Sequence, residues 1–154
     1  MKKTFNSGVA LLLSVATSVM AADAPSNFIG NWRVAGVAVS ANGVQALGDN
    51  DPSLMGKRLT FTPQRLAWDQ PTATNDACAE PTLDRLQAMP PAELQPQLRQ
   101  LGMRHPVAYM LRCGSGTWGP GDQMTVYLGA AGAVAMPWYD GGVLKLVKLP
   151  PPKD

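Results

Sequence analysis

Residues 27–34 read NFIGNWRV and place a Gly-x-Trp motif, Gly30-Asn31-Trp32, at the head of an apolar stretch. The pattern of a β-strand continues from there to residue 39. A glycine inside a strand often marks a bulge, so Gly36 predicts one in the middle of this strand. The folded domain is therefore expected to begin with a strand over residues 32–39.

Alternation of apolar and polar residues returns several times along the chain, bounded by glycine and proline. A strong turn signal, Tyr139-Asp140-Gly141-Gly142, precedes the last stretch. Many short strands in one small domain predict a mainly β fold, a single antiparallel barrel of about seven or eight strands, with a sandwich as the alternative. After the first strand, the expected strands cover residues 58–62, 66–68, 107–113, 124–128, 133–138 and 143–149.

Residues 70–106 interrupt this pattern and are expected to form a short helical insertion. Their leucines recur at helical spacing until Gly102, and three prolines would divide the helix into short pieces. The leucines are Leu83, Leu86, Leu94, Leu98 and Leu101, and the prolines are Pro90, Pro91 and Pro96. Residues 150–154 are expected to be a frayed tail.

The first residues have the composition of a signal peptide. Lys2 and Lys3 precede an apolar run over residues 9–20, and Val19-Met20-Ala21 resembles a cleavage site. The run is too short for a stable membrane-spanning helix, which needs about 20 residues, so a retained anchor is the less favoured alternative. The sequence thus predicts a signal peptide over residues 1–21, a single mature domain over 22–154, and a periplasmic or secreted location.

Charge and cysteine content limit the classes of function. Without Lys2 and Lys3, the mature chain has 11 basic and 11 acidic residues and no run of either sign, which argues against nucleic-acid binding. Cys78 and Cys113 are the only cysteines, and in an exported chain they are expected to form a disulfide, with two free thiols as the alternative.

Because antiparallel strands alternate in direction, the loops can be assigned to the two ends of the expected barrel. This assignment brings Trp118, Trp138 and Tyr139 to one rim, opposite the end where Trp32 enters. The interior is then either a cavity that holds a ligand under an aromatic mouth or a core filled by side chains. By alternation, the residues facing this interior are Met124, Val126, Val134, Met136, Trp138, Leu144 and Leu146.

Residue patterns that would support catalysis or metal binding are mostly missing. His105 is the only histidine, whereas a zinc site needs three or four ligands. Asp49-Asn50-Asp51 resembles the start of a calcium loop, but Leu54 stands where the loop needs glycine, which leaves a turn with Asp51 as a helix cap. Residues 113–118, CGSGTW, have Gly116 where a cysteine protease needs its nucleophile. No enzyme activity, metal or cofactor is predicted.

The order of motifs along the chain resembles that of secreted bacterial proteins with small lipocalin-like, or calycin-like, barrels. The motifs are FIGNWRV, LMGKRLTF at residues 54–61, one cysteine, a helical insertion, a second cysteine and a closing strand. This resemblance implies that Gly30 and Trp32 are structural and that Trp32 plugs the closed end of the barrel. The chain departs from lipocalins because it has no Thr-Asp-Tyr segment and no C-terminal helix. Lys145 and Lys148 stand where lipocalins place an arginine over the tryptophan.

Two functions are compatible with these features. The first is an exported, non-enzymatic protein that holds a small apolar or amphipathic ligand in the barrel, lined by the seven inward-facing residues. The second is a protein-binding role, as an inhibitor or immunity-type partner of a cell-envelope enzyme, through Trp118, Trp138 and Tyr139. Neither hypothesis involves nucleic acid or a stable membrane anchor.

Overall fold

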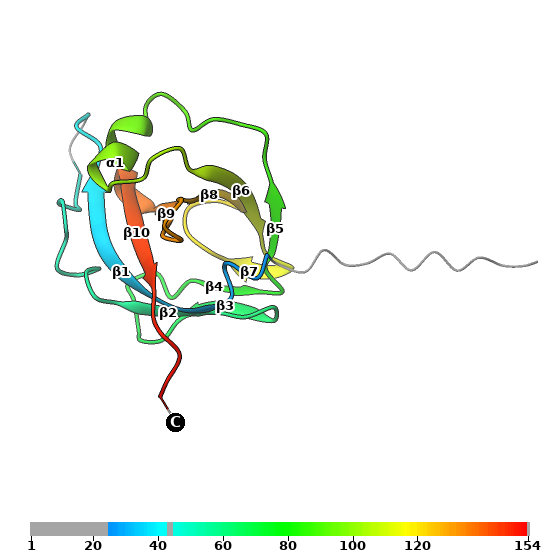
Figure 1. Cartoon of the computed structure of the whole chain (residues 1–154). Helices are drawn as coiled ribbons and strands as arrows, with labels where there is room; N and C mark the ends of the chain where they lie inside the picture. Colours follow the sequence, from blue (N-terminus) through cyan, green and yellow to red (C-terminus); the bar gives the residue numbers. More distant parts are fainter. Residues whose placement is uncertain (1–24, 43–44, 154) are drawn as a thin grey trace, which may run out of the picture.

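The computed structural model describes residues 25–42 and 45–153, so the expected signal peptide lies outside the described residues. All strands belong to one antiparallel sheet, which curves into a barrel-like shape (Figure 1). The fold is thus mainly β, as the sequence predicts. The strands are β1 (Gly30–Val39), β2 (Arg58–Phe61), β3 (Arg65–Trp68), β4 (Ala77–Ala79), β5 (Thr82–Arg85), β6 (Val107–Arg112), β7 (Ser115–Thr117), β8 (Gln123–Leu128), β9 (Val134–Pro137) and β10 (Gly142–Lys148).

The sheet contains ten strands, more than the seven or eight that the sequence predicts. Four of them are halves of two long bent strands, since only two residues separate β4 from β5 and β6 from β7. β4 pairs with β7 and β5 with β6, so the two bent strands lie side by side. The breaks include Pro81, which cannot donate a hydrogen bond, and Gly114.

The first and last strands are neighbours. β1 pairs with β2 on one side and with β10 on the other. The register of β1 with β10 shifts between Val34 and Gly36, so the bulge that Gly36 predicts is present. The bulge lets Val34 and Val37 both face the interior, while Ala38 faces outward.

Trp32 fills one end of the interior and is almost completely buried. Its indole N–H donates a hydrogen bond to the carbonyl oxygen of Phe28 at 2.8 Å. The Phe28 ring in turn packs edge-on against Tyr109, with ring centroids 5.1 Å apart. Lys148 Nζ lies 5.5 Å from the centroid of the Trp32 ring, within the range of a cation–π interaction. The segment preceding β1 therefore closes this end.

Residues 70–106 are not mainly helical, in contrast to the sequence prediction. They contain β4, β5 and one short helix, α1 (Gln95–Gln100), while a single 3-10 turn, η1 (Tyr139–Gly141), precedes β10. Leu83 belongs to β5 and points into the barrel core. The spacing of Leu83 and Leu86 matches that of a helix, whereas Leu83 is the single apolar residue of β5 and leaves that strand without an alternating pattern.

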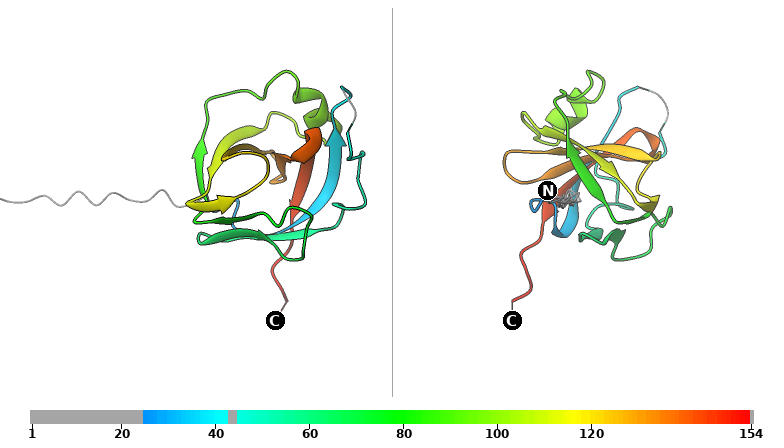
Figure 2. Two further views of the ribbon diagram at one scale, coloured as in Figure 1. Left: turned by 180° about the vertical axis from the view of Figure 1, so that it is seen from behind. Right: turned by 90° about the vertical axis from the view of Figure 1, so that its right-hand side faces the viewer.

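The helix α1 covers the outer face of the sheet and creates a second core there. In Figures 1 and 2 the helix lies outside the curved sheet, beside the end of β1. Leu98 and Met103 pack with outward-facing side chains of the sheet, namely Ala38, Tyr127 and Val143. The sheet thus buries most of its inner face in one core and part of its outer face in a second.

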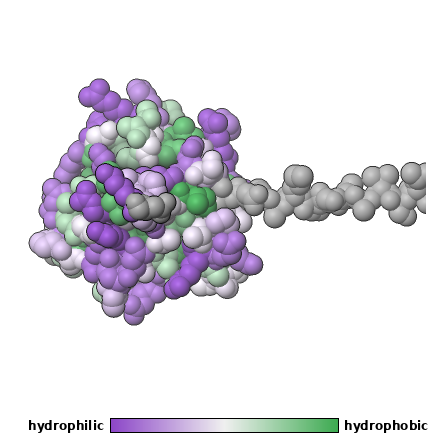
Figure 3. All heavy atoms as spheres, turned by 60° about the horizontal axis from the view of Figure 1, so that its bottom comes forward, coloured by the Kyte–Doolittle hydropathy of each residue, from purple (hydrophilic) through white to green (hydrophobic). Residues whose placement is uncertain are grey.

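One face of the outer surface is mainly polar. Figure 3, which brings the lower side of Figure 1 forward, shows a face covered mainly by hydrophilic residues, with hydrophobic ones in small separate patches. Among the described residues, no helix is both long enough and apolar enough to cross a membrane.

Candidate functional site

An aromatic cluster closes the end of the barrel opposite Trp32. It consists of Trp68 at the end of β3, Trp118 after β7, and Trp138 and Tyr139 after β9. Ring centroids of Trp68 and Trp118 lie 5.3 Å apart, and those of Trp118 and Trp138 lie 5.6 Å apart. The structure therefore brings Trp118, Trp138 and Tyr139 together, at the end where loop direction places them. It adds Trp68, which the sequence predicts only as part of a strand over residues 66–68.

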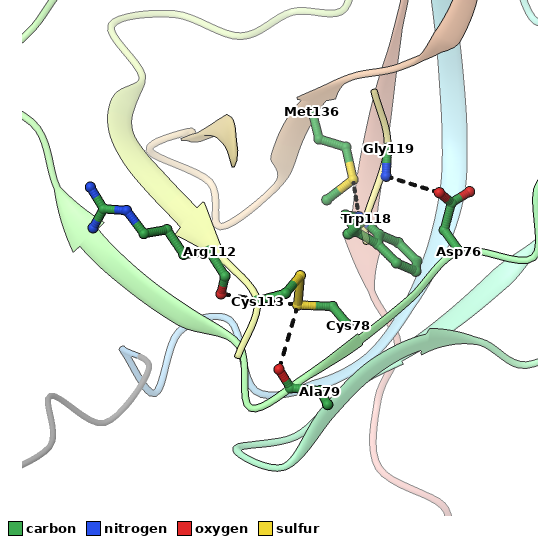
Figure 4. Close-up of a disulfide and its surroundings, with 8 residues drawn as sticks. All are labelled: Asp76, Cys78, Ala79, Arg112, Cys113, Trp118, Gly119 and Met136. Carbon is green, nitrogen blue, oxygen red and sulfur yellow. Dashed lines mark hydrogen bonds between the residues drawn. A yellow bond between two sulfur atoms is a disulfide. The ribbon is translucent and has the colours of Figure 1, made fainter. Parts of the chain in front are cut away.

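The cluster forms a plug and not an open mouth, because two of its four side chains are buried and the other two are partly buried. Trp118 is 2% exposed and Trp138 is 6% exposed. The Trp118 indole N–H points to the sulfur of Met136, with 3.2 Å between the two atoms (Figure 4). Trp118 is therefore not on the surface where the protein-binding hypothesis needs it, because hot-spot side chains must be reachable by the partner.

A buried carboxylate holds the plug in place. Asp76, in the loop between β3 and β4, is only 5% exposed. Its Oδ1 accepts a hydrogen bond from the Gly119 N–H at 3.2 Å (Figure 4). The Tyr139 hydroxyl lies 2.6 Å from the same Oδ1, and the Thr74 hydroxyl donates to Oδ2. Three segments far apart in sequence therefore meet at one side chain.

This environment also changes the acidity of Tyr139. Burial, followed by the hydrogen bond to Asp76 and its negative charge, raises the pKa of Tyr139 to about 12. The hydroxyl thus stays protonated and remains a donor at neutral pH. It also lies 3.0 Å from the Gly119 carbonyl oxygen, so its one proton has two acceptors within reach.

The role of Asp76 had no signal in the sequence. One aspartate among many in a polar loop looks solvated, and only the fold brings it to Tyr139 and Gly119. Trp68, in contrast, carries a detectable signal, since it follows Leu66 at period two and therefore shares its face. Its indole nitrogen is the one buried side-chain nitrogen or oxygen without a hydrogen-bond partner in the described part of the chain.

The barrel interior is filled. All seven residues predicted to face it are buried, and all belong to one continuous core. The cavity in this core has a volume of about 10 Å³ and is lined by apolar side chains only, among them Val126, Val134 and Met136. That space holds about one water molecule at most. Of the two arrangements that the sequence allows, the described residues adopt the filled core.

The disulfide predicted between Cys78 and Cys113 is present, with 5.2 Å between the two Cα atoms. Cys78 lies in the middle of β4, and Cys113 lies at the break between β6 and β7 (Figure 4). The bond therefore joins the two bent strands at the point where one of them is interrupted.

The remaining polar candidates have structural partners or lie apart. Asp51 accepts hydrogen bonds from the Ser53 N–H and hydroxyl, and the hydroxyl bond is the main cause of its lowered pKa. Asp49 accepts from the Val39 N–H at 2.9 Å. The segment is thus a capped turn. Within residues 25–42 and 45–153, no group of three His, Cys, Asp or Glu side chains is placed to hold a metal ion.

Comparisons with known proteins assign no family to this chain. No family model matches it, and no curated protein or solved structure matches it significantly.

Proposed function

We propose that this chain is an exported, non-enzymatic protein that recognises a protein partner through its outer surface. The observation that carries this proposal is the filled interior. Pockets for small ligands usually measure roughly 300–1,000 Å³, whereas the barrel leaves about 10 Å³. A ligand inside the barrel would have to displace buried side chains such as Trp118 and Met136.

The rigidity of the scaffold supports the same function. The disulfide joins two bent strands, and Asp76 fixes the loops at the aromatic end. Surfaces held in one conformation lose less conformational entropy when they bind a partner. An inhibitor or immunity-type partner of a cell-envelope enzyme would benefit from such a scaffold.

Export is supported by two features. The signal peptide pattern at residues 1–21 directs a chain across a membrane, and disulfides persist in oxidising compartments such as the bacterial periplasm. A lipocalin-like barrel is part of this proposal. Lys148 lies over the ring of Trp32, at the position where the resemblance places an arginine.

The proposal can be tested against its main competitor, a ligand held in the barrel. The mature chain, residues 22–154, would be purified from periplasm for native mass spectrometry and titrated with a fluorescent fatty acid. In parallel, photo-crosslinking in intact envelopes would search for a covalent complex with another protein. We expect the mass of the free chain, no quenching of tryptophan fluorescence, and a reproducible cross-linked complex.

Two outcomes would overturn the proposal. A retained lipid mass, or saturable tryptophan quenching by the fatty acid, would place the ligand inside the barrel. A Met136→Ala variant is a matched control for the fatty-acid titration, because the substitution enlarges the interior cavity. If the fatty acid binds inside the barrel, this variant should bind it with a different affinity from the wild type. The absence of any cross-linked complex would also count against a protein partner.

A further inference from the structure

An apolar groove lies on the outer surface beside α1. Its volume is about 310 Å³, and its walls come from the loop before α1, from α1 itself and from residues 103–106. Leu98 and Met103 are buried side chains that also line the groove, while Met89 stands at its edge with 83% of its surface exposed. We call this feature the α1 groove.

Met89 is the one large hydrophobic side chain that is fully on the surface among the described residues. A flexible, polarisable methionine adapts to different partner surfaces, and methionine is enriched in protein interfaces. Its position next to a recess with an apolar floor distinguishes it from a scattered surface residue, which needs no explanation.

The charges around the α1 groove have one sign. They come from Arg99 and Arg104, and no carboxylate lines the groove. The ion pair found among the described residues joins Arg112 to Asp84, so both groove arginines are without a carboxylate partner in that part of the chain. An uncompensated basic rim around an apolar recess is complementary to a partner with acidic groups beside an apolar side chain.

The groove is also held in a fixed shape. The buried side chain of Gln97 donates hydrogen bonds to the carbonyl oxygens of Ala38, at 3.3 Å, and Gly141, at 2.8 Å, which anchors α1 to the barrel. His105 has a positive φ of 44° although it precedes a proline. This strained conformation persists only where the surroundings impose it, and such strain is common at binding sites.

We propose that the α1 groove binds an acidic segment of the partner protein. The segment places an apolar side chain against the exposed Met89, over the apolar floor of the groove, and its carboxylates lie against Arg99 and Arg104. This inference rests on the proposed function and names the surface and the chemistry of the partner. A recess of this size suits one or two protruding side chains, which a flat lipid surface does not offer.

The test uses three fluorescently labelled peptides and the mature chain. The first peptide carries a central Leu-Phe pair flanked by Asp and Glu, the second has Lys in place of the acidic residues, and the third has Ser in place of Leu-Phe. Fluorescence anisotropy measures the dissociation constants, and NMR chemical shifts locate the site. We expect the first peptide to bind at least about tenfold more tightly than the other two, as removal of an interface anchor predicts.

Matched variants separate the groove from general charge effects. We expect two variants to weaken the binding of the acidic peptide by about tenfold or more. They are Met89→Ser and the double variant Arg99→Glu with Arg104→Glu. Met89→Leu keeps the apolar contact and should retain binding. Arg65→Glu is the charge control, since Arg65 lies on β3, away from α1, and is exposed. Melting temperatures of all variants should match the wild type, because the altered side chains are exposed.

Several results would overturn this inference. One is equally tight binding of the acidic and basic peptides. Another is a set of NMR chemical-shift changes that lie outside the groove. A third is binding to phosphatidylglycerol vesicles without binding to the acidic peptide. The photo-crosslinking experiment distinguishes failure of the α1 groove as the binding site from failure of the proposed protein-binding function. A complex that persists in Met89→Ser and in the arginine double variant would leave a protein partner in place and remove the α1 groove as its site.

Discussion

At the scale of single residues, Asp76 has the largest number of partners at the aromatic end. Replacing it with alanine leaves the Gly119 N–H without its acceptor in a buried place. We expect Asp76→Ala to lower the free energy of unfolding by roughly 1–3 kcal/mol, the cost of an unsatisfied buried polar group. Urea denaturation followed by tryptophan fluorescence measures this change.

Asp122→Ala is the matched control for Asp76→Ala. Asp122 is exposed in the loop between β7 and β8, at the same end of the barrel. Its replacement should change stability by less than about 0.5 kcal/mol. Equal effects of the two substitutions would mean that Asp76 does not hold the plug.

Because of Tyr139, the free energy of unfolding is expected to fall at alkaline pH. Its pKa is about 12 in the folded chain and 10.0 in its ordinary state. Since the folded pKa is the higher one, the protonated hydroxyl stabilises the fold fully below pH 10.0, and this contribution is lost as the pH rises to about 12. Urea midpoints at several pH values should show the loss.

Tyr139→Phe separates this effect from that of other tyrosines. Burial also raises the pKa of Tyr127, so the wild type has more than one source of alkaline sensitivity. The difference in stability between wild type and Tyr139→Phe should therefore shrink across the same pH range. A constant difference would contradict the role given to the Tyr139 hydroxyl.

Trp32 contributes to stability at the opposite end. Trp32→Ala removes a buried ring, its hydrogen bond to Phe28 and the surface under Lys148. We expect it to lower the free energy of unfolding by roughly 3–5 kcal/mol, as other large-to-small changes in cores do. Binding should change only through folding, so a fully stable variant that has lost its partner would contradict this role.

At the scale of elements, the disulfide is the strongest constraint on the two bent strands. It closes a loop with a sequence separation of 35 residues. On the chain-entropy model, replacing both cysteines with serine should lower the free energy of unfolding by about 4 kcal/mol. Urea denaturation of the wild type with and without reductant gives the same comparison, and a change below about 1 kcal/mol would contradict it.

The sequence predicts elements well where alternation is long enough. Met124 and Val126 define β8, and Leu59 and Phe61 define β2, because each pair faces the same core. β4 and β7 have three residues each, with no pattern that could be detected. Their formation depends on pairing with distant strands, which a local pattern does not contain.

The same limit applies to the candidate site. Strand direction alone placed Trp118, Trp138 and Tyr139 at one end, and the structure brings them together. Their burial could not be predicted, since it depends on how the loops fold over the barrel. Asp76 and the α1 groove depend on contacts between segments that are far apart in sequence.

At the scale of the whole molecule, the chain builds two cores on the two faces of one sheet. The inner core fills the barrel, and the outer one lies under α1. The helix therefore has two roles, because it covers the sheet with Leu98 and forms the wall of the α1 groove. Met89 is exposed and belongs to neither core, so Met89→Ser is expected to change binding at the proposed site without unfolding the protein.

The pairing of β1 with β10 also determines when the barrel can close during synthesis. During synthesis, β1 lacks one of its two neighbours until β10 has left the ribosome. A nascent chain that ends before Gly142 would expose the edges of both β1 and β9, and exposed edges promote aggregation. Pairing of β1 therefore stays incomplete until the segment Gly142–Lys148 is present, and variants truncated before Gly142 are expected to be insoluble.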